Sequence, residues 1–381
     1  MNKETGQTIY ARLADIDTSW MRTFNTDMIN GFAQNGVEVR VVPERGTTQD
    51  NNERDIFMHR LRVLESFSQI SIQDRDVLFV SCPLRCSLDQ LYWVSEVVKQ
   101  KKPTVACYTL TGTFIDEDWI TVFTPWVSNL EKIWYEKSDL IFVPTEYFKQ
   151  AMLKHGYDER KIFVVGAPVD SEGISAHAQQ RDNNLIIFNH RLNEDKKPMY
   201  FLRMAEDLST QFPDLKFYIS TNLSEENFWR TMDEDVNHRL KDALSRVRSL
   251  GILFNNSREE YFELLNRAYL APCFSTHETF GFSVAESMAA GCIPILPARL
   301  TYPELVKDDA DFMYSSTGDL ERDYKEALER AVYFILNPKF GEMKSAEAKS
   351  LIERFRPKNV VGTILEKIEK HAREALNNGK N

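Results

Sequence analysis

The chain has 381 residues, of which 43% are apolar and 27% charged, so it is neither a disordered segment nor a low-complexity fibre. Its length fits two or three domains of ordinary size. Acidic residues outnumber basic ones, 57 to 47, and the net charge is −10. This balance disfavours a protein that holds nucleic acid through a large positive field, although a local basic groove is compatible with it.

The five cysteines are scattered and odd in number, which argues against a disulfide framework. Cys82 and Cys86 have no second Cys or His pair at zinc-finger spacing, so no metal site is expected. We expect reduced thiols, mostly in the core, in a cytoplasmic protein. The first ten residues lack the apolar core of a signal peptide, and no apolar run approaches the roughly 18 residues of a membrane span.

Short apolar runs alternate with helical patterns along the first half of the chain. Such alternation is typical of a parallel, doubly wound sheet. The predicted strands are residues 8–13, 37–42, 77–81, 104–109, 140–144 and 162–165, and the helices between them include 23–35, 88–101 and 146–155. Residues 171–184 are polar and without clear periodicity, so we expect an interdomain linker there.

A second alternating series follows the expected linker. Its predicted strands are residues 185–189, 215–220, 252–254, 271–274, 293–296 and 312–314, and its helices are 198–209, 225–249, 259–268, 281–290, 320–336 and 360–376. We therefore predict an α/β protein with one domain over residues 1–170 and another over 185–350. The last helix, about 357–381, is expected to pack back on the first domain. Two such domains form a cleft, and ligands of open α/β sheets sit at the carboxyl ends of the strands.

The most informative motif is the stretch STHETFGFSVAE, residues 275–286, between a strand and a helix. Its two carboxylates, Glu278 and Glu286, can face one cavity, and carboxylates accept hydrogen bonds from sugar hydroxyls. Gly281 lets a ligand approach the backbone, and the amides of Phe282 and Ser283 at the helix N-terminus favour an anion. This pattern suits a nucleotide sugar. The alternative is a helix-start acid and a solvated helix residue.

Two further elements accompany this motif. In residues 188–198, FNHRLNEDKKP, the cations Arg191 and Lys196 could clamp a diphosphate and stabilise it as it leaves; the alternative is a solvated polar loop. In residues 291–304, Gly291 ends a helix and the strand 292–296 follows. Arg299 there would contact the donor or cross the cleft, unless this segment is purely structural.

These three elements, in this order and spacing, resemble the carboxyl-terminal domain of GT-B glycosyltransferases of the retaining family-4 type. The family pattern of two glutamates around Phe-Gly is matched by Glu278, Phe280, Gly281 and Glu286. The runs 190–198 and 299–304 are similar to the branch that includes the tRNA-queuosine mannosyltransferases. The resemblance covers about residues 184–314 and implies two Rossmann-like, doubly wound domains that face one another across a cleft.

The resemblance also implies roles for the site residues. The catalytic residues would be Arg191, Lys196 and Glu278, with Glu286 on the ribose of the nucleotide. The remaining donor-binding residues would be His190, Asn255 near the base, Phe280, Gly281, Phe282, Ser283 and Arg299. The donor would be a nucleotide sugar, with no cofactor and no metal ion. The amino-terminal domain would bind the acceptor.

The amino-terminal half departs from the family pattern. The loop 14–20, which includes Asp15, Asp17 and Trp20, replaces the usual Gly-Gly loop, and no His stands in residues 108–114. We expect a modified nucleobase in nucleic acid as acceptor, either queuosine-like tRNA or hydroxymethylpyrimidine phage DNA, the latter in the host cytoplasm. The side chains available for stacking on such a base are Trp20, Arg22, Arg85, Tyr92, Trp93, Trp119 and Trp126. Small-molecule, lipid and polysaccharide acceptors remain open.

The expected mechanism is transfer with retention, in which the leaving diphosphate takes the proton of the acceptor. The alternative is inversion, with Asp15 or Asp17 as general base. A function of another class is non-catalytic binding of a sugar nucleotide. A Rossmann oxidoreductase is disfavoured because no G-x-G-x-x-G follows the first strand.

Overall fold

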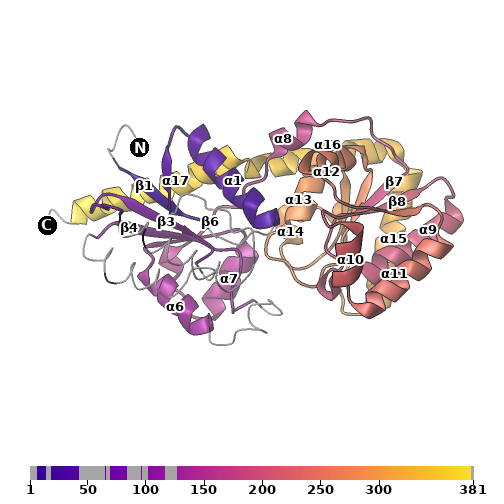
Figure 1. Ribbon diagram of the computed structural model, residues 1–381, viewed down its shortest axis with the longest axis horizontal. Coiled ribbons are helices and arrows are strands. Elements are labelled where there is room, and N and C mark those ends of the chain that lie inside the picture. Colours follow the sequence, from indigo (N-terminus) through magenta and orange to yellow (C-terminus); the bar gives the residue numbers. More distant parts are fainter. Residues whose placement is uncertain are drawn as a thin grey trace. The chain divides into compact units, whose positions relative to one another are not determined.

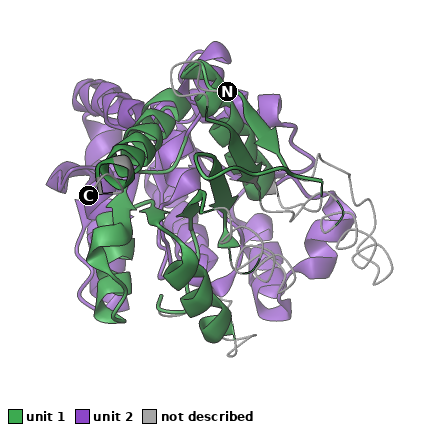
Figure 2. Cartoon of the chain, turned by 90° about the vertical axis from the view of Figure 1, so that its left-hand side faces the viewer, with its two compact units in different colours: residues 1–168, 355–381 green, residues 169–354 purple. Residues whose placement is uncertain are grey.

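The computed structural model describes residues 7–13, 19–42, 65, 69–83, 96, 102–115 and 127–378. The chain divides into two compact units, residues 1–168 with 355–381 and residues 169–354 (Figure 2). Each unit contains a sheet of six parallel strands with helices packed on it (Figure 1). Every strand predicted from the sequence is present, with ends shifted by at most two residues, so the α/β class is confirmed.

The sheet of the first unit has the order β2-β1-β3-β4-β5-β6, and all neighbouring strands are parallel. Its strands are β1 (Ile9–Arg12), β2 (Val39–Val41), β3 (Val77–Ser81), β4 (Thr104–Tyr108), β5 (Leu140–Val143) and β6 (Ile162–Val164). Its helices include α1 (Ser19–Gln34), α6 (Val127–Lys137), α7 (Glu146–Lys154) and α17 (Pro357–Asn378). Strand β3 is buried along its whole length, as expected for a parallel strand covered on both faces.

The last helix, α17, belongs to the first unit although it ends the chain, and it packs against α1 (Figure 1). Gly31 allows the two helices to approach closely, because a Cβ there would overlap Pro357 and Val361. The amide of Asn35 adds a hydrogen bond of 2.9 Å to the carbonyl oxygen of Lys358.

The sheet of the second unit has the order β12-β11-β10-β7-β8-β9. Its strands are β7 (Leu185–Phe188), β8 (Lys216–Ser220), β9 (Leu250–Leu253), β10 (Leu270–Pro272), β11 (Ile293–Pro297) and β12 (Met313–Tyr314). Counted within the unit, this is the 3-2-1-4-5-6 order of dinucleotide-binding sheets, in which the strand order reverses between β7 and β10. Ligands of such sheets bind at that reversal, beyond the carboxyl ends of the strands.

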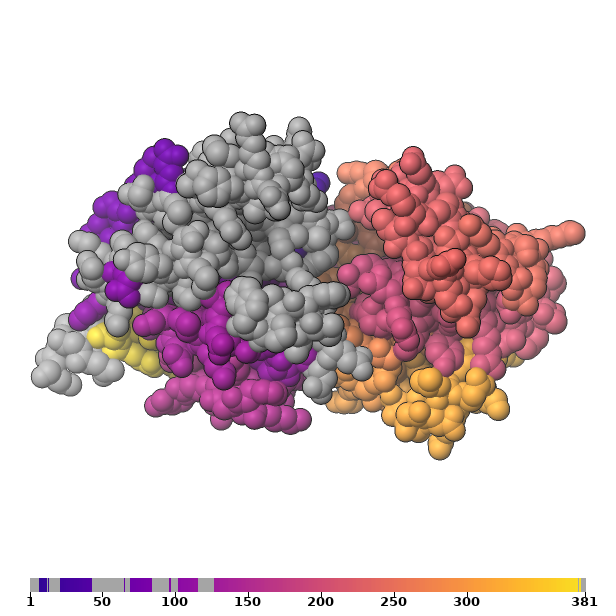
Figure 3. All heavy atoms as spheres, turned by 60° about the horizontal axis from the view of Figure 1, so that its bottom comes forward, coloured from indigo at the N-terminus to yellow at the C-terminus, as the bar shows by residue number. Residues whose placement is uncertain are grey.

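The helices of the second unit correct three expectations. They are α8 (Ser171–Ala176), α9 (Pro198–Gln211), α10 (Glu225–Thr231), α11 (Glu234–Arg246), α12 (Arg258–Arg267), α13 (Phe282–Ala290), α14 (Tyr302–Leu305), α15 (Leu320–Leu336) and α16 (Pro338–Ile352). The expected helix 225–249 is two helices, because the side chain of Asp233 accepts from the amides of Asp235 and Val236 and starts α11. Both helices lie on the surface of the second unit, in the red part of Figure 3. Helices α14 and α16 were not predicted.

The expected linker over residues 171–184 is the third correction, because this segment is part of the second unit. Its helix α8 begins where the side chain of Asp170 accepts from the amide of Gly173, and it packs on α12 and α13. Ile174 is fully buried, and its carbonyl oxygen accepts a hydrogen bond of 2.7 Å from the amide of Asn266. A helix of six residues is too short to produce a visible hydrophobic period.

Candidate functional site

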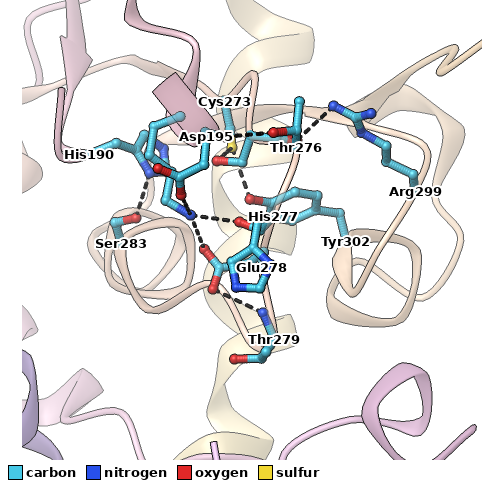
Figure 4. A network of polar contacts seen from close by, with 12 residues as sticks. His190, Asp195, Cys273, Thr276, His277, Glu278, Thr279, Ser283, Arg299 and Tyr302 are labelled. Atoms are coloured by element: carbon cyan, nitrogen blue, oxygen red, sulfur yellow. Dashed lines mark hydrogen bonds and ion pairs between the residues drawn. The ribbon is translucent and has the colours of Figure 1, made fainter. Parts of the chain in front are cut away.

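The predicted site residues gather at the reversal of the second sheet. The loop after β7 provides His190, Arg191 and Lys196, and the loop after β10 provides Glu278 and leads into α13. Figure 4 shows His190, Asp195, Cys273 and Glu278 around one network of polar contacts. Two loops that are distant in sequence therefore meet because their strands are neighbours in the sheet.

Lys196 is buried at the centre of this network, with 9% of its side chain exposed. Its Nζ lies 2.7 Å from the carbonyl oxygen of His277, 3.3 Å from Oε2 of Glu278 and 3.2 Å from Oδ2 of Asp195. An ammonium group has three N–H donors, so these three acceptors engage all of them.

The charges of this cluster stabilise one another. Burial alone would lower the pKa of Lys196, but the carboxylates of Glu278 and Asp195 outweigh it and raise that pKa above its ordinary value. Burial would likewise raise the pKa of Glu278, and Lys196, His190 and the amide of Thr279 together hold it below its ordinary value. Lys196 is therefore a cation and Glu278 an anion at neutral pH.

Helix α13 begins beside this pair. Gly281 is its N-cap and has a φ of +92°, a backbone conformation that favours glycine. Phe282 and Ser283 follow as the first residues of the helix, whose N-terminal end is a favourable position for an anion. The hydroxyl of Ser283 lies 2.8 Å from Nδ1 of the buried His190, which ties the helix start to the end of β7 (Figure 4).

Cys273 contributes a buried thiol to the same network (Figure 4). Its sulfur is 3.0 Å from the hydroxyl of Tyr302 and 3.3 Å from that of Ser275. Burial by itself would raise the pKa of this thiol. His190 and these two hydroxyls together outweigh burial and lower the pKa to about 7, below its ordinary value. The described cysteines, Cys82, Cys107, Cys273 and Cys292, are all buried thiols, in agreement with the prediction of core residues.

Glu286 is held by residues that the sequence did not reveal. Its Oε1 accepts a hydrogen bond of 2.6 Å from Nη2 of Arg258, and its Oε2 accepts one of 2.8 Å from the hydroxyl of Tyr261. Asn189 lies behind them, with its Nδ2 2.9 Å from the hydroxyl of Tyr261 and 3.0 Å from the carbonyl oxygen of Ser283. Asn189 directly follows β7 and Arg258 begins the helix after β9, and this placement at strand ends is the one signal that could have found them.

The remaining predicted residues of the second unit are Arg191, Asn255, Arg299 and Phe280. Arg191 is exposed and has no ion-pair partner among the residues that the structure describes. Asn255 is exposed in the turn after β9, with a φ of +53°. Arg299 donates from Nη2 to the carbonyl oxygen of Ser275 at 2.9 Å. Phe280 is buried, and its ring centroid is 5.0 Å from that of Phe282.

Several predictions fall outside the described residues. Asp15 and Asp17, the alternative bases, lie in the undescribed segment 14–18, and Trp20 is described only as a backbone position in α1. The stacking candidates that also lie outside are Arg85, Tyr92, Trp93, Trp119 and Trp126. Over the described ranges, no group of three or more His, Cys, Asp or Glu could hold a metal ion. In the same ranges, no helix is long and apolar enough to cross a membrane.

Comparison with known proteins agrees with this geometry. Residues 170–349 match the family model described as Glycosyl transferases group 1. A structure of Anabaena HepE in complex with UDP and glucose aligns with 96% of this chain and 100% of its own, with a TM-score of 0.66 and 12% identity. The chain has the GT-B fold.

Two further relatives are similar over part of their lengths. The pneumococcal O-GlcNAc transferase GtfA, solved with UDP and GlcNAc, aligns with 81% of this chain and 59% of its own, with a TM-score of 0.60 and 14% identity. The tRNA-queuosine alpha-mannosyltransferase of Drosophila melanogaster is 26% identical over 189 residues, which are 49% of this chain and 45% of the fly protein. The chain therefore spans about half the length of the fly protein that it matches.

Proposed function

We propose that the chain is a glycosyltransferase that moves a sugar from a nucleotide-sugar donor to a hydroxyl acceptor. The observation that supports this most directly is the arrangement at the reversal of the second sheet. The loops and the helix at this edge carry a buried Lys–Glu pair, the start of α13 and Glu286. These groups suit the hydroxyls of a sugar, a diphosphate and the hydroxyls of a ribose. The matching family model covers the same segment.

In this proposal the diphosphate binds between Arg191, Lys196 and the amides of Gly281, Phe282 and Ser283. Because all three donors of Lys196 are engaged, a phosphate oxygen must replace one of its acceptors. Asp195 is the acceptor that we expect to leave, because its side chain is 26% exposed and that of Glu278 only 16%. Glu278 then stays in place to accept from sugar hydroxyls.

We further propose transfer with retention and without a metal ion. The bond from the anomeric carbon to the diphosphate oxygen breaks, and the acceptor oxygen bonds to that carbon on the same face. The proton of the acceptor passes to the leaving diphosphate oxygen, whose charge Arg191 and Lys196 stabilise. The anomeric configuration of the product, determined by NMR, tests this proposal, and an inverted product overturns it.

For the acceptor we propose a modified nucleobase in tRNA, on the basis of the name of the fly relative and the similar runs around Lys196 and Glu304. A modified base in DNA and a small molecule are the competing acceptors. Incubation with donor and with total tRNA, hydroxymethylated DNA or small glycosides, followed by mass spectrometry, distinguishes them. A mass increase of one sugar on tRNA nucleosides supports the proposal, and an increase only on another acceptor overturns it.

The proposal as a whole is tested by donor binding and turnover. A thermal-shift panel of UDP-, GDP- and ADP-sugars identifies the donor, because a ligand that binds only the native state raises the melting temperature. Release of the nucleotide from that donor then distinguishes an enzyme from a non-catalytic binding protein. Binding without release or transfer would favour the binding protein, and no binding at all would overturn both.

A further inference from the structure

Glu286 is the carboxylate that this proposal assigns to the ribose, and it is fixed from one side only. One bond comes from Arg258 and the other from Tyr261, each to a different carboxylate oxygen. An ionised carboxylate has about four lone-pair directions, so two acceptor directions remain for a ligand. The side chain is 11% exposed, so these directions have limited access to solvent.

Tyr261 acts as an obligate donor in this arrangement. Burial and the adjacent carboxylate of Glu286 raise the pKa of Tyr261 well above its ordinary value, so the hydroxyl keeps its proton. That proton points to Oε2 of Glu286, since the hydroxyl oxygen accepts in turn from Nδ2 of Asn189 at 2.9 Å. The chain of donors therefore runs in one direction, from Asn189 through Tyr261 to Glu286.

The same network reaches the start of α13. Nδ2 of Asn189 lies 3.0 Å from the carbonyl oxygen of Ser283 and 3.0 Å from the hydroxyl of Ser287. Arg258 is held against aromatic rings, with its guanidinium carbon 4.4 Å from the ring centroid of Phe262. The carboxylate of Glu286 is thus held in one orientation by residues from three places, after β7, near the start of α12 and along α13.

We infer that Tyr261, Asn189 and Arg258 are positioning residues that aim Glu286 at the ribose hydroxyls, so that this protein selects donors that carry both hydroxyls over donors that lack them. This inference rests on the proposed function. A carboxylate that is preorganised by fixed donors loses no rotamer freedom when it binds two vicinal hydroxyls. It also leaves a buried acceptor unsatisfied when the ligand lacks those hydroxyls, and this costs affinity.

The test follows the logic of a double-mutant cycle, in which one change is a substitution in the protein and the other is loss of the ribose hydroxyls from the ligand. Calorimetry measures the binding of nucleotides to the full chain and to Tyr261→Phe. The ligands are UDP, GDP and ADP and their 2′,3′-dideoxy counterparts. We expect the nucleotide that binds best to bind Tyr261→Phe about tenfold more weakly, the value for one hydrogen bond to a charged group. Its dideoxy counterpart should bind both proteins equally within about twofold, because coupling is lost when the partner group is absent.

Tyr269→Phe is the matched control. It also removes a tyrosine hydroxyl bond of the second unit, the 2.9 Å bond to the carbonyl oxygen of Phe334, and should change neither affinity. Arg258→Gln is the second variant, and it should repeat the selective loss. Equal losses for ribose and dideoxyribose ligands would overturn the inference while leaving the proposed function intact. A wild-type chain that binds none of the three nucleotides would overturn the proposed function itself.

Discussion

Replacement of Lys196 by methionine tests the electrostatics of the site most directly. The variant keeps an unbranched side chain, one atom shorter, and removes the charge between Glu278 and Asp195. Removing one partner of a buried ion pair costs about 3–5 kcal/mol of stability. Because Glu278 and Asp195 remain 16% and 26% exposed, we expect the lower end, about 3 kcal/mol at pH 7.

The pH dependence of this loss follows from Glu278, whose native pKa is depressed. Its contribution to stability is fully present above the ordinary value of about 4.3 and disappears as the pH falls through the lower native pKa. In Lys196→Met the same carboxylate is buried without its cation, which raises its pKa, and it takes up a proton at a higher pH. The gap between wild type and variant should therefore be largest near neutral pH and shrink toward acid pH.

The assay is urea unfolding at several pH values between 7 and 4, followed by hydrogen exchange in peptides of residues 185–297. Lys344→Met is the control, since Lys344 is also buried and pairs with Asp309, Asp311 and Glu347 at 2.6–2.9 Å. Both variants should lose stability, but only Lys196→Met should lose donor affinity. A stability gap below about 1 kcal/mol, or one that is constant with pH, would refute the reasoning.

Three further predictions concern the same site. Gly281→Ala places a side chain at a φ of +92° and a Cβ 3.3 Å from Tyr302. It should lower the free energy of unfolding in urea by about 1–2 kcal/mol and weaken donor binding, and unchanged values would contradict the role of the turn. Asp195→Asn removes the carboxylate that competes for Lys196, so calorimetry should show nucleoside diphosphates binding about fivefold more tightly, and weaker binding would count against the proposed exchange. Arg191→Ala should leave stability within about 0.5 kcal/mol, because its side chain is exposed, yet weaken the same ligands at least about tenfold.

The amino-acid sequence was sufficient for the strands of both sheets and for the turn that begins α13. Apolar runs bounded by turn residues are local signals, and each of the expected strands is present for that reason. The turn at Gly281 is local too, since a positive φ before a helix favours glycine. Sequence missed α8 and α14, because helices of four to six residues leave little periodicity, and it joined α10 to α11 across a side-chain cap. It also missed α16.

The partners of the site residues depended on tertiary structure. Nothing in the loop 188–198 indicates that Lys196 has all three donors engaged, because two of its acceptors follow β10, some 80 residues later. In the sequence, Tyr261 and Arg258 look like ordinary residues at the start of a helix. Their role follows from the tertiary structure, which places α12 beside α13 and Glu286. Spacing along the chain specifies which groups are available, whereas strand order specifies which of them meet, because neighbours in a parallel sheet are set by crossovers that carry no local signature.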